Sequence, residues 1–143
     1  MTMTANPLLG PIILLAIWTI VMLFVAITKI IGGTKGIKIE GLPKNPTGRD
    51  LEGHVPHESL CARRNYEHLT EQPTIFYALV FALILMGYDG MLGTVLAWIY
   101  VGLRIVHSIM QTMNRSRAFW FTASTLCLIV ISGIAVGRYI GMV

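Results

Sequence analysis

Residues 118–137 of the chain have the sequence AFWFTASTLCLIVISGIAVG, twenty residues without a charged side chain. An α-helix needs about 20 apolar residues to cross the hydrocarbon of a bilayer. Three further apolar segments precede this one, at residues 8–31, 74–88 and 91–113. The pattern predicts four membrane-spanning helices.

The composition favours an integral membrane protein. The chain of 143 residues is 55% hydrophobic and 13% charged, whereas an ordinary soluble domain has about 25% charged residues. We expect the first apolar segment to remain in the protein, because it lacks the basic start of a signal peptide and is longer than the apolar core of one. We predict a single domain, an all-α bundle of four transmembrane helices at about residues 7–32, 59–87, 91–114 and 117–140.

Basic residues gather in two of the three connections between these helices. The third connection carries Arg115 and Arg117, whereas the second has only one charged residue, the acidic Asp89. The basic residues in or beside the long first connection (residues 33–58) are Lys29, Lys35, Lys38, Lys44, Arg49, Arg63 and Arg64. By the positive-inside rule, the first and third connections are cytoplasmic and both termini lie outside. The net charge of +4 is explained by this topology and needs no nucleic-acid partner.

Two rows of polar side chains interrupt the apolar segments. One row is Arg64, His68, Glu71 and Gln72, and the other is Tyr100, Arg104, His107, Gln111 and Asn114. Both rows follow the 3.6-residue period, so each lies on one face of a helix. The turn at residues 87–90 makes the two helices antiparallel, so the rows meet near the cytoplasmic end. They predict a cationic, hydrogen-bonding pocket there.

Glu71 and Arg104 allow two interpretations. A charge at bilayer depth costs at least a few kcal/mol and normally marks function. The two residues can pair to hold the bundle together, with His107 and Gln111 as interhelical hydrogen-bonding groups. Alternatively, the excess of arginine over glutamate leaves positive charge for an anionic ligand. The residues alone leave both interpretations open.

The segments RNYEHLTEQPTIF (64–76) and RIVHSIMQTMNRSR (104–117) resemble the MAPEG family, the membrane-associated proteins in eicosanoid and glutathione metabolism, in its bacterial branch. The resemblance covers nearly the whole chain. It departs from the family at His68, where asparagine is usual, and at His107 and Gln111, where the eicosanoid-making members have tyrosines.

The resemblance implies a homotrimer, in a bacterial inner membrane, that binds glutathione between subunits near the cytoplasmic face. It implies that Arg117 is the catalytic cation, which lowers the pKa of the glutathione thiol because the thiolate is the nucleophile. The residues that it implies for glutathione binding are Arg64, His68, Glu71, Arg104, His107, Gln111 and Asn114.

The leading interpretation is a glutathione-dependent transferase or peroxidase that acts on lipophilic electrophiles reached from the lipid. The alternative is a non-catalytic membrane subunit of the same fold that binds a protein partner. We expect no metal site, because the His-x-x-His spacing of His54 and His57 lacks a defined second pair of ligands.

Overall fold

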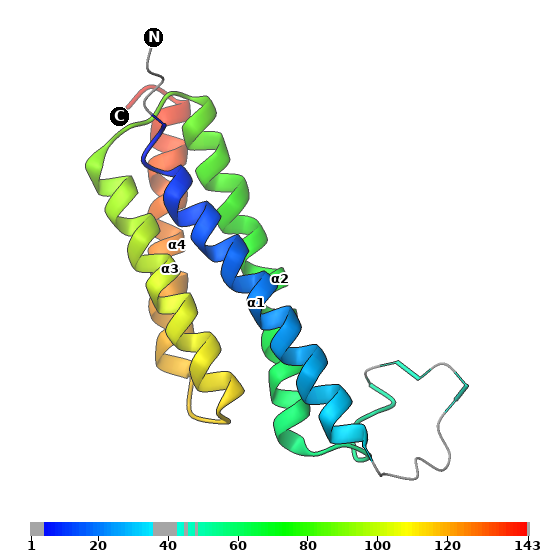
Figure 1. Cartoon of the computed structure of the whole chain (residues 1–143). Coiled ribbons are helices and arrows are strands. Elements are labelled where there is room, and N and C mark those ends of the chain that lie inside the picture. The colour runs from blue at the N-terminus through cyan, green and yellow to red at the C-terminus, as the bar shows by residue number, and fades with distance from the viewer. Residues whose placement is uncertain (1–4, 36–42, 45, 48, 143) are drawn as a thin grey trace.

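The computed structural model describes residues 5–35, 43–44, 46–47 and 49–142 (Figure 1). These residues form four α-helices and no strand, and the helices are α1 (Leu9–Thr34), α2 (His57–Leu85), α3 (Met91–Thr112) and α4 (Ala118–Tyr139). Each helix is long and apolar enough to cross a membrane. The chain is therefore an all-α four-helix bundle and a multi-pass integral membrane protein, which confirms the predicted fold class.

The helices run up and down the bundle. Helix α1 packs along α2 and α3 packs along α4, while α2 also contacts α3 and α4. The start of α1, the end of α4 and the α2–α3 connection lie at one end, and the end of α1, the start of α2 and the α3–α4 connection lie at the other (Figure 1). We call this second end the basic end, since its residues include Lys29, Arg63, Arg64, Arg115 and Arg117.

Three of the helices end in the same backbone conformation. The residue after the last helical turn has a positive φ, which is 65° at Gly87, 54° at Asn114 and 75° at Gly141. In α3 the amide of Asn114 donates to the Gln111 carbonyl at 3.1 Å, and the next amide donates to the Met110 carbonyl at 2.8 Å. This is the Schellman motif, which glycine and asparagine tolerate best. Asn114 therefore ends α3 and lies beyond its regular turns.

Side chains before α1 and near the end of α4 make hydrogen bonds that hold together the end of the bundle opposite the basic end. The Asn6 side chain accepts a hydrogen bond from the amide of Leu8 at 2.9 Å and donates one to the carbonyl of Tyr88 at 3.0 Å. The Arg138 guanidinium donates to the carbonyl of Met86 at 3.2 Å. These contacts attach the start of α1 and the end of α4 to the α2–α3 connection.

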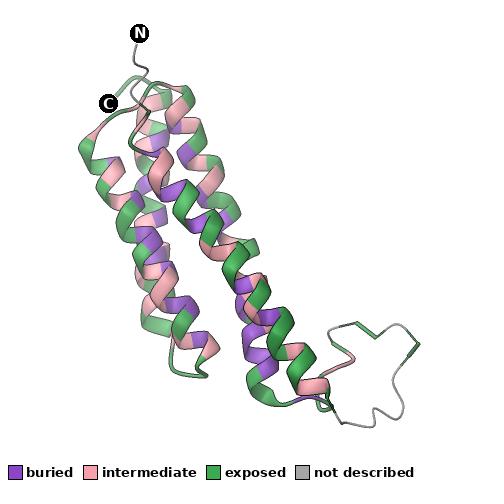
Figure 2. Ribbon diagram, in the orientation of Figure 1, coloured by how far each residue is buried: buried purple, intermediate pink, exposed green. Residues whose placement is uncertain are grey.

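Buried residues lie on the inner faces of the helices and exposed residues on the outer faces (Figure 2), and large apolar side chains occur in both sets. In the core, Phe76 and Tyr100 are fully buried, and their ring centroids lie 4.4 Å apart. The outward surface includes Ile13, Ile17, Phe24, Ile129 and Val136. Lipid tails are as apolar as these side chains, so the exposure suits a bilayer.

Candidate functional site

A cavity of about 460 Å³ opens between α2, α3 and the start of α4, in the half of the bundle nearer the basic end. Its volume is typical of a small-molecule site. Its lining residues are His68, Glu71, Gln72, Arg104, His107, Arg117, Ala118, Phe121 and Thr122. The helical period brings the polar rows of α2 and α3 to this cavity, because residues three and four apart share a face.

The Arg104 side chain is the most unusual feature of this cavity. It is only 1% exposed. Its Nε donates to the Tyr100 hydroxyl at 3.3 Å, and its guanidinium carbon lies 5.8 Å and 5.6 Å from the ring centroids of Tyr100 and Phe121. One of its terminal nitrogens, NH2, is buried without a hydrogen-bond partner. Leaving such a buried donor unsatisfied is costly, so this nitrogen is suited to an acceptor from a ligand.

Glu71 and Arg104 do not form an ion pair. The ion pairs among the described residues are Arg63 with Glu67 and Arg64 with Glu52. Glu71 is exposed on α2, whereas Arg104 packs against two aromatic rings inside the bundle. Both residues line the cavity but form no ion pair with each other, so the interpretation of this pair as a structural ion pair is wrong for the single chain.

The two histidines of the cavity have different surroundings. The Nδ1 of His68 lies 3.0 Å from the Oε1 of Gln111, and Gln111 is 1% exposed. His107 is also 1% exposed, and its ring lies 6.0 Å from that of Phe121 and 6.3 Å from that of His68. Among the described residues, no hydrogen bond is made by the His107 ring. Thus only His68 has its ring held by a defined partner.

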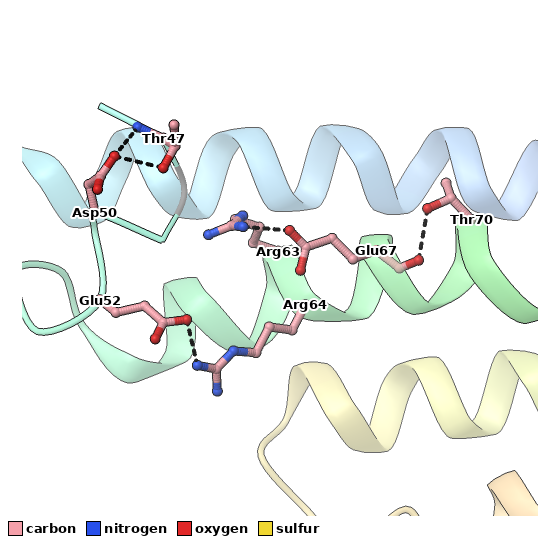
Figure 3. A network of polar contacts seen from close by, with 7 residues as sticks. All are labelled: Thr47, Asp50, Glu52, Arg63, Arg64, Glu67 and Thr70. Carbon is pink, nitrogen blue, oxygen red and sulfur yellow. Dashed lines mark hydrogen bonds and ion pairs between the residues drawn. The ribbon is translucent and has the colours of Figure 1, made fainter. Parts of the chain in front are cut away.

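Arg64 lies outside the cavity, in contrast to its predicted place in the pocket. Its guanidinium donates to Glu52 at 2.8 Å, and the two side chains are 45% and 49% exposed (Figure 3). This hydrogen bond and the positive charge of Arg64 lower the pKa of the Glu52 carboxyl from its usual range. Glu52 lies within the turns at residues 49–54 of the α1–α2 connection, and its position was not predictable from helical periodicity.

Asn114 also lies away from this cavity. Its Oδ1 is 3.8 Å from the Sγ of Cys61, and it lines a separate cavity with Lys29 and Glu58. The prediction placed Asn114 on the polar row of α3. That row stops before it, because α3 ends at Thr112 and Asn114 adopts the left-handed conformation.

Helix α4 contributes residues that the polar rows did not predict. Ala118, Phe121 and Thr122 complete the cavity wall. Gln72 donates to the Thr125 hydroxyl at 2.9 Å, which attaches α2 to α4 beside the cavity. For Phe121 the sequence offered one indication, its spacing, because it lies one helical turn after Arg117.

The fold and the cavity define a class of protein: a four-helix integral membrane protein with a polar, arginine-containing cavity within the bundle. Comparison with protein families matches residues 8–137 to the MAPEG family. Comparisons with curated proteins and with solved structures find no match. The chain belongs to the MAPEG family, and is thus a membrane protein of the family that acts in eicosanoid and glutathione metabolism.

Proposed function

We propose that the protein is a glutathione-dependent membrane transferase or peroxidase that acts on lipophilic electrophiles. The observation that carries the proposal is a cavity lined by two arginines, Arg104 and Arg117, and a carboxylate, Glu71. Arg104 also has a buried donor without a hydrogen-bond partner. Glutathione carries two carboxylates, one ammonium group and one thiol. In this proposal the arginines bind the anionic groups and Glu71 binds the ammonium group, as charge-assisted hydrogen bonds favour.

Arg117 is our candidate for the catalytic cation. It is half-buried at the start of α4 and lines the same cavity as Arg104. A cation near a thiol lowers the pKa of that thiol and increases the fraction of nucleophilic thiolate. The electrophile enters from the surrounding lipid in this proposal, since the outer surface of the helices is apolar.

We also propose that the chain assembles as a homotrimer and that neighbouring subunits complete the site. In the single chain, Glu71, Thr70 and Thr74 are exposed on α2, although α2 is long and apolar enough to span the membrane. Charged groups are costly against lipid tails. A second subunit packed over this face removes Glu71 from lipid. The proposed location is a bacterial inner membrane with the basic end in the cytoplasm.

Calorimetric titration of the detergent-purified protein with glutathione tests the proposal, with product analysis by mass spectrometry after adding a lipophilic electrophile. We expect saturable binding and formation of the glutathione thioether. Two analogues refine the test: S-methylglutathione keeps the carboxylates and should bind without forming product, and the amide of the glycine carboxylate should bind more weakly.

The alternative function is a non-catalytic membrane subunit that binds a protein partner. Binding of glutathione without product from any electrophile or hydroperoxide would favour that alternative. Absence of glutathione binding to an oligomer of correct mass would reject the proposed function.

A further inference from the structure

We infer that His68 accepts the proton of a thiol bound in the cavity, and that Gln111 is the positioning residue that holds the His68 ring ready for this step. The inference rests on the proposed function, because it assigns a role in a thiol-dependent reaction. It extends the role of His68 from ligand binding to proton transfer. It also gives a reason for the buried position of Gln111.

The hydrogen bond between the two side chains determines where the ring proton lies. Gln111 Oε1 is 3.0 Å from His68 Nδ1. An amide oxygen accepts hydrogen bonds and cannot donate them, so in this arrangement Nδ1 carries the hydrogen and Nε2 of the neutral ring keeps its lone pair. His68 also lines the cavity. The ring is thus set in the tautomer whose remaining nitrogen can accept a proton.

Gln111 holds this geometry from a buried position, with its Oε1 toward His68 and its Nε2 without a hydrogen-bond partner in the single chain. It is 1% exposed and lies on the buried face of α3. A base that is itself oriented by a third group is the usual arrangement for activating a nucleophile in enzymes. The Gln111–His68 pair provides the base and its orienting group, and the bound thiol provides the nucleophile.

The neighbouring His107 is less suited to this role. Among the described residues no hydrogen bond holds either nitrogen of its ring, so its tautomer is not defined. It lies one helical turn from Arg104 on α3, where a new positive charge is opposed by the guanidinium. His68 instead has Glu71 three residues further along α2, and residues at this spacing are neighbours on a helix surface. His68 thus shares a helix face with a carboxylate, whereas His107 shares one with a guanidinium.

Charged and titratable groups from all three helices line the cavity around His68. Helix α2 contributes Glu71, α3 contributes Arg104 and His107, and Arg117 precedes α4. In the proposed step the S–H bond breaks, the proton moves to Nε2 of His68, and the electron pair stays on sulfur. The thiolate then forms a bond to the electrophilic carbon. The leaving group departs with the electrons of its bond, and His68 returns its proton to that group or to solvent.

The test counts protons during glutathione binding to the oligomer in detergent. Thiolate is followed by its ultraviolet absorbance, and proton release is obtained from binding enthalpies measured in buffers of different ionisation enthalpy. If His68 accepts the proton, thiolate forms near neutral pH with almost no proton released to the buffer. One proton released per thiolate would overturn the inference.

Substitutions separate the base from its positioning residue. His68→Gln keeps a polar side chain but cannot accept the proton, so we expect saturable glutathione binding with the thiolate lost at neutral pH and recovered at higher pH. We expect kcat/KM to fall by about 10²- to 10⁴-fold, the range for a general base. Gln111→Leu should give a smaller loss with the pH profile moved in the same direction, and Gln111→Asn should restore part of it.

The matched control is His54→Gln, which changes an exposed histidine of the α1–α2 connection and should behave like the original protein. Normal thiolate formation in His68→Gln would reject the role of His68, even with glutathione binding intact. Absence of glutathione binding to the original protein would reject the proposed function itself, so the two failures are distinguishable.

Discussion

Replacing Arg104 with methionine separates a ligand-binding arginine from a structural one. Methionine is apolar and fills a similar elongated space. The change removes a buried nitrogen without an acceptor, one hydrogen bond to Tyr100 and two contacts with the rings of Tyr100 and Phe121. The effect on stability is the balance of these contributions.

These contributions nearly cancel. An unsatisfied buried polar group costs about 1–3 kcal/mol, and a hydrogen bond contributes about 0.5–1.5 kcal/mol. A cation–π contact contributes about 0.5–1 kcal/mol at an exposed site and about 2 kcal/mol when desolvated. We take the lower value for each contact here, because both guanidinium-to-ring distances, 5.8 Å and 5.6 Å, are close to the upper limit for such contacts. We therefore expect Arg104→Met to change the free energy of unfolding of the ligand-free protein by no more than about 2.5 kcal/mol in either direction. Denaturant titration in mixed micelles, followed by tryptophan fluorescence, measures this change.

Glutathione affinity should respond much more strongly to the same substitution. Loss of a hydrogen bond to a charged group weakens binding by about 1.5–3 kcal/mol, which corresponds to about a 10- to 150-fold rise in Kd. Arg104→Lys keeps the charge but loses the planar fork of donors, so its Kd should lie between those of the original protein and Arg104→Met. Loss of about 3–5 kcal/mol of stability, the cost of breaking a buried ion pair, with unchanged Kd would refute this reasoning.

Three further predictions address other parts of the molecule. Arg117→Ala should raise the pKa of the bound thiol and reduce thiolate absorbance at neutral pH. The control Arg115→Ala, in the exposed α3–α4 connection, should leave both unchanged. Equal effects of the two substitutions would exclude a specific role for Arg117. Arg64→Ala should have little effect on stability, because ion pairs at the exposed surface contribute little, and it should leave glutathione affinity unchanged. The same substitution should raise the lowered pKa of Glu52 toward its usual range in an NMR titration. Because folding lowers this pKa, the pair stabilises the protein above the ordinary pKa of glutamate, and this stabilisation is lost as the pH falls through the lowered pKa. In a background without native cysteines, an impermeant thiol reagent should label a cysteine at Asp89 in intact cells and spare one in the α1–α2 connection; the reverse pattern would contradict the proposed topology.

Most of the fold was predictable because it depends on local features of the sequence. Apolar segments long enough to cross a bilayer gave the number and order of the helices. The tight turn around Gly87 gave the antiparallel relation of α2 and α3. Helix ends were less certain, since α1 continues through Gly32 and Gly33 to Thr34, although glycine often ends a helix.

The candidate site was partly predictable for the same reason. His68 and Glu71 share a face of α2, and Arg104 and His107 share a face of α3, so the antiparallel hairpin brings both pairs to one cavity. This argument depends only on the helical period. It does not specify which side chains touch, so it could not exclude an ion pair between Glu71 and Arg104.

The remaining features of the site depend on tertiary structure. Arg64 pairs with Glu52, and the connection that positions Glu52 has no periodic pattern. Asn114 leaves the polar row because α3 ends two residues earlier. Phe121 reaches the cavity because α4 packs along α3, a contact that one apolar helix sequence does not specify.

Photoaffinity labelling with a photoreactive derivative of glutathione tests most directly whether the cavity between α2, α3 and α4 is the glutathione site. Peptide mass spectrometry identifies the labelled residues. We predict labelling within residues 68–72, 104–107 or 117–122, suppressed by excess glutathione. Labelling that excess glutathione does not suppress, or suppressible labelling confined to the separate cavity beside Lys29 and Asn114, would contradict this assignment.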